Sequence, residues 1–254
     1  MAINVLTEHD FKPRRAEEAA RLLGKKVALT SEQFDRLSAE QKANAFRIAK
    51  VNNARLVQRT RDILVKHVKD GTPWPDVRRQ LMALFGTEGL PRPAISRIRL
   101  IFHQNTMQAY SAARRQTLDS PEIARAFPYR RYMTVGNGTP GVRNVRPEHA
   151  VLHGKVFAWD DPFWDRFTPP WDYGCRCTFV ALTAGQVKGR RVTVWTYSGG
   201  AIRPAPAKKQ LTKGRRGKAV KLAPKPGFGS GKIENVDLSG LDEDLREAIE
   251  ERIK

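Results

Sequence analysis

Cysteine is scarce in this 254-residue chain, which has two in all, Cys175 and Cys177. Two cysteines in a chain of this length do not indicate a secreted scaffold held together by disulfides. A bridge between two cysteines separated by one residue would also be strained, because disulfide geometry is restrictive. The sequence therefore predicts a fold that rests on hydrophobic cores, and a chain of this length can bury one or two of them.

Long apolar runs and targeting segments are also missing from the sequence. No stretch of about twenty apolar residues occurs, so we expect no transmembrane helix and no membrane partner. The first residues, MAINVLTEHDF, lack the basic start and apolar centre of a signal peptide. We therefore expect a protein that is made and kept in the cytoplasm, or in a particle assembled there.

The residue spacings of several enzyme classes are absent as well. The chain has no H-E-x-x-H motif, no Walker phosphate-binding loop and no G-x-S-x-G elbow, which argues against an enzyme. The alternative to a non-catalytic protein is a metal-dependent, nuclease-like enzyme that uses the region from His149 and His153 to Cys175 and Cys177. There a histidine would act as general base, with carboxylates as metal ligands from the set Asp160, Asp161 and Asp165. A generic nucleic-acid-binding protein of the ribosomal type is a third hypothesis.

Acidic residues are absent from residues 173–233, which carry fourteen Lys and Arg side chains. The whole chain has 46 Lys and Arg against 26 Asp and Glu, a net charge of +20. A strongly basic surface favours polyanions. Because no base-reading element is evident, we expect binding of double-stranded DNA without sequence preference. The candidate contact residues are Arg190, Arg191, Arg203, Lys208, Lys209, Lys213, Arg215, Arg216, Lys218 and Lys221.

The pattern of apolar residues divides the chain into four regions and indicates an α+β protein. Residues 14–127 repeat apolar positions at three- and four-residue steps and contain two capping-box patterns, which predicts a helical domain. Residues 128–198 alternate in short runs and predict a small mixed α/β motif domain with short strands. Residues 199–237 are rich in Pro, Gly, Lys and Arg, and predict a flexible basic arm.

The last region, residues 238–254, predicts a short amphipathic helix. Leu241, Leu245, Ile249 and Ile253 are spaced four residues apart, and the first turn contains the acidic residues 242–244. Two interpretations stay open. Either the helix folds back on the helical domain or caps the basic arm, or it docks into a groove of a partner protein.

The segment 146–177 contains both cysteines and two of the five histidines of the chain. His149 and His153 are four apart, which places them on one face of a helix, and Cys175 and Cys177 share one side of a strand. Two imidazoles and two thiolates form a tetrahedral zinc set, although the spacing is not that of a zinc finger. We favour buried packing cysteines and keep zinc as the alternative. We also expect His149 to lie beside both cysteines.

Bulky aromatic residues fill the middle of this segment, DDPFWDRFTPPW. A packed mini-core would bury their large apolar surfaces, whereas an aromatic platform would stack nucleic-acid bases. The nearby aspartates would repel phosphate, and we therefore favour the mini-core. The residues concerned are Phe163, Trp164, Phe167 and Trp171.

Several motifs occur here in an order that resembles the Mu F-like phage head morphogenesis proteins, also called minor head or minor capsid proteins. The motif residues are Arg146, His149, Gly154, Asp161, Pro162, Phe163, Trp164, Pro169, Pro170, Cys175, Arg176 and Cys177. Upstream, TSEQFDRLSAEQKANAFRIAKV and the helix around Asn105 resemble the helical half of the family, so the resemblance spans roughly residues 14–182. It departs at residues 171–174, where the family usually has an Asn-Gly turn.

The resemblance implies a low-copy internal component of a phage head. Such a protein associates with portal, capsid or scaffold proteins and with packaged DNA, acts in head assembly, and in some relatives affects genome ejection. It implies a location inside the virion, and in the host cytoplasm during assembly. It implies neither catalysis nor a small-molecule substrate, and we expect no cofactor other than the zinc considered above.

Overall fold

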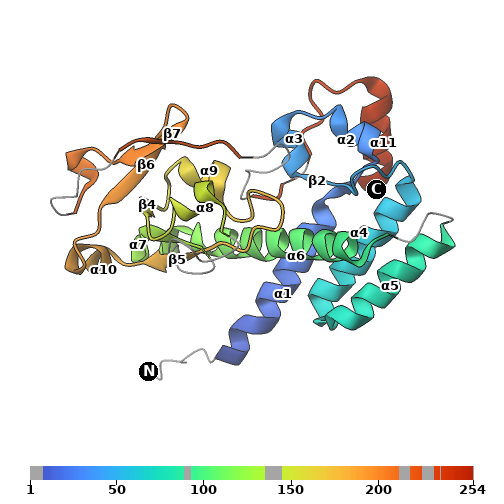
Figure 1. The fold of residues 1–254 in the computed structure, drawn as a ribbon, viewed down its shortest axis with the longest axis horizontal. Coiled ribbons are helices and arrows are strands. Elements are labelled where there is room, and N and C mark those ends of the chain that lie inside the picture. Colours follow the sequence, from blue (N-terminus) through green and yellow to red (C-terminus); the bar gives the residue numbers. More distant parts are fainter. Residues whose placement is uncertain are drawn as a thin grey trace. The chain divides into compact units, whose positions relative to one another are not determined.

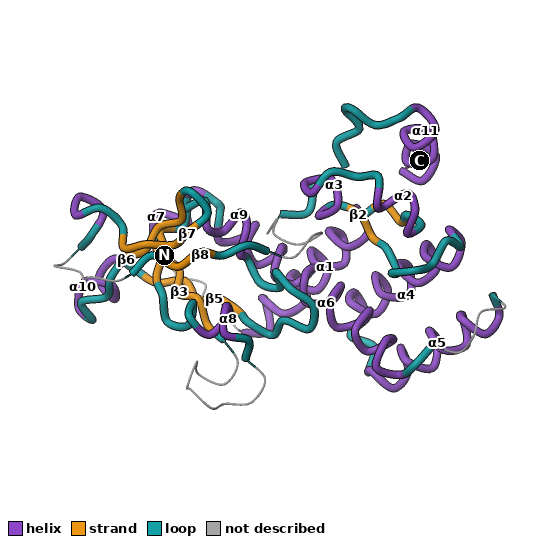
Figure 2. Tube along the Cα trace, turned by 45° about the horizontal axis from the view of Figure 1, so that its top comes forward, coloured by secondary structure: helices purple, strands orange, loops and turns teal. Residues whose placement is uncertain are grey.

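The computed structural model describes residues 8–88, 93–134, 145–211, 218–224, 232–234 and 236–253. The chain divides into two compact units, Met1–Ala113 with Ile233–Lys254, and Arg114–Lys232. Helices make up most of the first unit, and a six-stranded mixed sheet with short helices makes up the second (Figures 1 and 2). The predicted α+β class is therefore confirmed. Among the described residues, no helix combines the length and apolar character needed to cross a membrane.

The helical unit is built around four long helices: α1 (Glu8–Lys25), α4 (Ala54–Asp70), α5 (Trp74–Thr87) and the first part of α6 (Ile95–Leu118). Their apolar faces meet in one core, in which the side chains of Leu56, Leu64 and Leu81 have no exposed surface. Helix α4 ends at Gly71, whose left-handed backbone is the usual helix stop.

Short elements complete this unit. Helices α2 (Ser31–Asp35) and α3 (Ala39–Ala43) lie between the strands β1 (Val27–Ala28) and β2 (Ala45–Phe46), which pair in parallel. Both predicted capping boxes are present. The Thr30 hydroxyl accepts from the Gln33 amide, and the Gln33 side chain accepts from the Thr30 amide. Ser38 and Gln41 repeat the arrangement.

The C-terminal helix α11 (Glu243–Ile253) folds back onto the helical unit. Its residues Leu245 and Ile249 are buried in a cluster with Leu29, Phe34 and Leu37. This packing decides between the two interpretations of residues 238–254, because the apolar face that could have docked elsewhere is covered by the chain itself. At the start of the helix, Arg36 bridges Asp242 and Asp244 at 2.7 Å each.

The second unit has one sheet, with the strand order β5-β3-β4-β6-β7-β8. The β4–β6 pair is parallel and the other pairs are antiparallel. The strands are β3 (Tyr129–Met133), β4 (Val156–Ala158), β5 (Thr178–Leu182), β6 (Val194–Ser198), β7 (Ala201–Pro204) and β8 (Val220–Lys221). The connections contain α7 (Pro121–Ala126), α8 (Pro147–Ala150), α9 (Phe163–Phe167), α10 (Ala184–Gly189) and the 3₁₀ turn η1 (Ala207–Lys209).

The predicted flexible arm, residues 199–237, contains folded elements where the structure describes it, and its residues 212–217, 225–231 and 235 lie outside the described residues. Gly199 and Gly200 both have positive φ, as the two-residue loop of a hairpin requires, and they join β6 to β7. Strand β8 then adds to β7, and Ile202 and Leu222 are buried. The polar composition concealed these strands, because a few buried apolar residues, among them Ile202 in β7 and Leu222 just after β8, suffice to anchor them. The unit boundary also lies at residue 113 rather than 127, so α7 belongs with the sheet.

Candidate functional site

The aromatic residues of the DPFW segment form the core of the second unit. The side chains of Phe163, Trp164, Phe167 and Trp171 are at most 1% exposed. Phe163 stacks on Phe157 of β4 with ring centroids 3.8 Å apart, and Trp164 meets the edge of Phe163 at 5.0 Å. Rings buried in this way have no face left for a nucleic-acid base. The predicted mini-core is therefore confirmed.

Asp161 holds this segment against the sheet. Its Oδ1 accepts from the Phe163 amide at the start of α9 and from the Tyr197 amide of β6, both at 3.0 Å. The indole nitrogen of Trp164 donates to the carbonyl oxygen of Ala158 at 2.9 Å. Burial raises the pKa of Asp161, because desolvation disfavours the carboxylate, while these hydrogen bonds oppose the shift. Asp161 and Pro162 therefore shape a turn that links β4, α9 and β6.

An ionic network lies beside the aromatic core, and its central residues Arg115, Asp119 and Arg130 were not singled out from the sequence. Arg115 of α6 donates to the carbonyl oxygen of Trp164, to Asp165 at 2.6 Å and to Asp119 at 3.2 Å. Asp119 also pairs with Arg130, whose side chain is 1% exposed. Burial lowers the pKa of Arg130, and Asp119 opposes this shift. The alternation of β3 already placed Arg130 on the same face as the buried Tyr132, which was the available indication.

His149 lies in the single turn of helix α8. Pro147 occupies the first position of this helix, where its missing N–H costs nothing. The side chain of His149 is buried, and its imidazole stacks on the indole ring of Trp171, with centroids 3.9 Å apart and an angle of 6°. The Trp171 nitrogen donates to the Tyr132 hydroxyl at 2.7 Å, so the position of the stack is fixed from β3.

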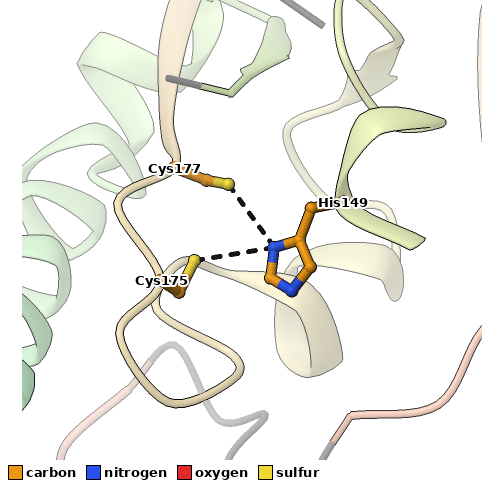
Figure 3. Close-up of side chains that lie close together, drawn as sticks. All are labelled: His149, Cys175 and Cys177. Carbon is orange, nitrogen blue, oxygen red and sulfur yellow. Dashed lines mark hydrogen bonds between the residues drawn. The ribbon is translucent and has the colours of Figure 1, made fainter. Parts of the chain in front are cut away.

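Both cysteines reach the same nitrogen of His149. The Nδ1 atom lies 3.7 Å from the sulfur of Cys175 and 3.5 Å from the sulfur of Cys177 (Figure 3). A turn before β5, in which Gly174 has a positive φ and the Cys175 amide donates to the Asp172 carbonyl at 3.2 Å, directs both thiols inward. Arg176 between them is exposed. The expected cluster of His149 with the two cysteines, and the outward Arg176, are confirmed.

The opposite nitrogen of His149 faces a carboxylate. His149 Nε2 is buried without a hydrogen bond and lies 3.8 Å from Asp172 Oδ2. Arg146 pairs with the same carboxylate oxygen at 3.0 Å and also donates to the Tyr173 carbonyl at 2.7 Å. The motif residues Arg146 and His149 therefore act on the same aspartate, which occupies the segment where the chain departs from the family pattern.

His153 does not join this cluster, which corrects the predicted ligand set. Helix α8 ends at Ala150, and Gly154 turns the chain with a φ of +74°. The two histidines therefore never share a helix face. The His153 Nδ1 instead accepts from the Thr134 amide at 3.1 Å and lies 2.9 Å from the Thr134 hydroxyl oxygen. Three of the four expected ligands lie together, and the fourth, His153, is hydrogen-bonded to the residue that follows β3.

The thiols differ in their acidity. The pKa of Cys177 is lowered to about 7, first by a hydrogen bond from the Cys175 thiol and then by one from the Tyr132 hydroxyl, against the effect of burial. The pKa of Cys175 is raised because its thiol donates this hydrogen bond to Cys177 and because it is buried. The two cysteines are not joined by a disulfide.

A cavity of about 390 Å³ opens beside the two cysteines, lined by Val145, Arg146, His149, Gly174, Cys175, Arg176 and Cys177. A thiolate and an imidazole facing a cavity suit metal ligation.

The predicted DNA-contacting residues lie on the sheet-containing unit. Arg190 and Arg191 follow α10, Arg203 is on β7, and Lys208 and Lys209 are in η1. Lys218 and Lys221 lie before and on β8, and all seven side chains are exposed. Lys213, Arg215 and Arg216 fall outside the described residues. The seven described basic residues therefore lie on or next to folded elements of the sheet-containing unit.

The sequence matches the family model described as Phage Mu protein F like protein over residues 58–180. It is 30% identical to the Mu-like prophage FluMu F protein of Haemophilus influenzae over 173 residues, 62% of this chain and 39% of that protein. It is 29% identical to the putative capsid assembly protein F of Escherichia phage Mu over 193 residues, 68% of this chain and 41% of that protein. The chain thus matches about two fifths of the length of these relatives. No solved structure matches it significantly.

Proposed function

We propose that this chain, which belongs through residues 58–180 to the Phage Mu protein F like family, acts in the assembly of a phage head. The name of the phage Mu relative, putative capsid assembly protein F, supports this role. The matched residues include α4, α5 and α6 of the helical unit and the motif region up to β5. Both compact units therefore contribute to the region shared with the family.

The role we propose is structural rather than catalytic, and one observation carries it. The motif residues of the DPFW segment are used for packing: their rings are buried, and the Asp161 carboxylate accepts two backbone N–H groups. The nuclease-like alternative would need the aspartates of residues 160–165 to be free to bind a metal beside a histidine. Asp165 instead pairs with Arg115, and His153 accepts from Thr134. These contacts support a rigid module that occupies a place in the particle.

More specifically, we propose that the chain occupies a low-copy position inside the head, in association with the portal or prohead. The helical unit supplies large apolar side chains for such a contact, since Ile95, Leu100 and Tyr110 of α6 are between 36% and 49% exposed. Identification of the chain in purified proheads and virions tests this proposal, and a chain recovered only outside both particles would contradict it.

We also propose that the chain contacts packaged DNA and acts in genome ejection. The seven exposed basic side chains of the sheet-containing unit support it, together with the absence of acidic residues from 173 to 233. Binding through phosphate contacts alone would have no sequence preference and would weaken steeply as the salt concentration rises.

The structure determines how DNA contact must be tested. Deletion of residues 203–232 would remove β8 and part of β7, so charge has to be removed by substitution instead. Replacement of Arg203, Lys208, Lys209 and Lys221 by glutamine should reduce the salt dependence of binding, whose slope falls by roughly one for each lost phosphate contact. A control variant with Arg78 and Arg79 of α5 replaced by glutamine should bind as the wild type does. Equal losses in the two variants would contradict a contact through the sheet-containing unit.

A further inference from the structure

We propose that His149, Cys175 and Cys177 bind a zinc ion through one imidazole nitrogen and two thiolate sulfurs that the fold already directs at a common point. The three ligand atoms lie within 4.8 Å of one another and all three residues are buried. The inference rests on this geometry and is independent of the proposed role in head assembly.

The distances between ligand atoms match those around tetrahedral zinc. Zinc binds histidine nitrogen at about 2.0–2.1 Å and cysteine sulfur at about 2.3 Å, so tetrahedral angles place nitrogen and sulfur roughly 3.6 Å apart. The observed separations from His149 Nδ1 are 3.7 Å to Cys175 Sγ and 3.5 Å to Cys177 Sγ. Both nitrogen–sulfur separations therefore agree with an ion held between the three atoms.

The surroundings of His149 also suit a metal ligand. A histidine that ligates zinc usually donates its other ring N–H to a carboxylate or carbonyl, which fixes the tautomer and the ring orientation. Here Nε2 is buried, lacks a hydrogen-bond partner and faces Asp172 at 3.8 Å, while Arg146 holds that carboxylate in place. Zinc at Nδ1 would keep the proton on Nε2, where the carboxylate attracts it. Stacking on Trp171 already fixes the plane of the ring.

The ligand types select the metal. Thiolates favour zinc over magnesium and calcium, which prefer oxygen ligands. Two thiolates and a neutral imidazole also balance the double charge of the ion. The cavity beside the three ligands, lined also by Arg146, Gly174 and Arg176, would leave room for a water molecule as the fourth ligand. The ion would then join the short helix α8 to the turn at residues 171–177 and stabilise the sheet-containing unit.

The metal content of the full-length chain, purified without a metal-binding tag, tests the site. Elemental analysis should find about one zinc per chain, as a single tetrahedral site requires. Cys177→Ser and His149→Gln should each lose most of the zinc, and circular dichroism shows whether the variant is folded. His153→Gln is the matched control and should retain the zinc. Zinc that persists in folded Cys177→Ser would place the metal elsewhere and overturn the proposal.

Cobalt substitution keeps the proposal falsifiable where a variant fails to fold. The wild-type chain, stripped of metal and loaded with Co²⁺, should show the intense visible bands of tetrahedral cobalt and the charge-transfer absorption of cobalt bound to thiolates. Cys175→Ser should reduce the charge-transfer absorption by about half, because one of two thiolates is lost. A folded wild-type chain that takes up neither zinc nor cobalt would contradict the site, as would a cobalt spectrum without thiolate absorption.

Discussion

The imidazole ring of His149 lies flat against the indole ring of Trp171, with centroids 3.9 Å apart. This contact joins the two ends of the motif region, the turn that begins at Arg146 and the segment that follows Pro170. The Trp171 nitrogen is bonded in turn to the Tyr132 hydroxyl of β3. One ring therefore connects the histidine–cysteine cluster to the aromatic core and to the sheet.

Trp171→Ala should destabilise the sheet-containing unit by about 3–5 kcal/mol, as expected for truncation of a buried tryptophan. Four of the five tryptophans lie in this unit, so denaturant unfolding followed by tryptophan fluorescence reports on it. Tyr173→Ala is the control, because that side chain is 44% exposed. Equal unfolding midpoints for the two variants would show that the stack has no structural importance.

Asp119→Asn should lower the free energy of unfolding of the sheet-containing unit by about 3 kcal/mol. The substitution removes the carboxylate from two buried guanidinium groups, those of Arg115 and Arg130. Glu122→Gln removes a charge three residues away, where Glu122 and Arg125 are exposed and 4.0 Å apart. That control should change stability by less than about 0.5 kcal/mol. A loss for Asp119→Asn as small as the control's would mean that solvent reaches the network.

Leu245→Ala should destabilise the helical unit by about 2–5 kcal/mol, because Leu245 is buried against the α2 region. Ile253 belongs to the same apolar series in the sequence but is 55% exposed, so Ile253→Ala should have almost no effect. Thermal unfolding followed by helical circular dichroism measures both variants. A larger loss of stability for Ile253→Ala than for Leu245→Ala would mean that α11 does not pack as described.

Lys26 should make the helical unit more stable as the pH rises above neutrality. Its ammonium group is buried and donates to Gln108 at 2.8 Å, and burial lowers its pKa to about 7 from the ordinary 10.5. Between these values the unfolded chain binds one more proton than the folded chain, so stability increases with pH by at most about 1.4 kcal/mol per unit. The difference in unfolding free energy between wild type and Lys26→Met, measured from pH 7 to 10, isolates this group. A constant difference would contradict the assignment.

The sequence was sufficient to predict parts of the site because their patterns are local. Strand-like alternation places Cys175 and Cys177 on one side, and the concentration of rings and prolines indicates an ordered core around Trp164. The place of His153 was predicted wrongly, because four-residue spacing implies a shared face only while a helix continues, and α8 ends after one turn.

Other features depend on contacts between distant segments. Asp119 looks like an ordinary residue at the end of a helix, and only the return of β3 places Arg130 beside it. The strands β7 and β8 lie in a stretch whose composition is that of a linker, and they are held by Ile202 and Leu222. The location of α11 could not be decided from its own amphipathic pattern, since the surface that covers it comes from residues more than two hundred positions earlier.

The most direct test of the role in head assembly is the yield of infectious particles from a phage genome that encodes this chain and from the same genome with its gene removed. We expect particles with faulty heads or low infectivity after removal, restored by the wild-type chain and also by His153→Gln, since that side chain lies outside the cluster. Normal yields of infectious phage without the chain would contradict the account. A folded His153→Gln protein that enters particles but fails to restore infectivity would point to chemistry at that residue.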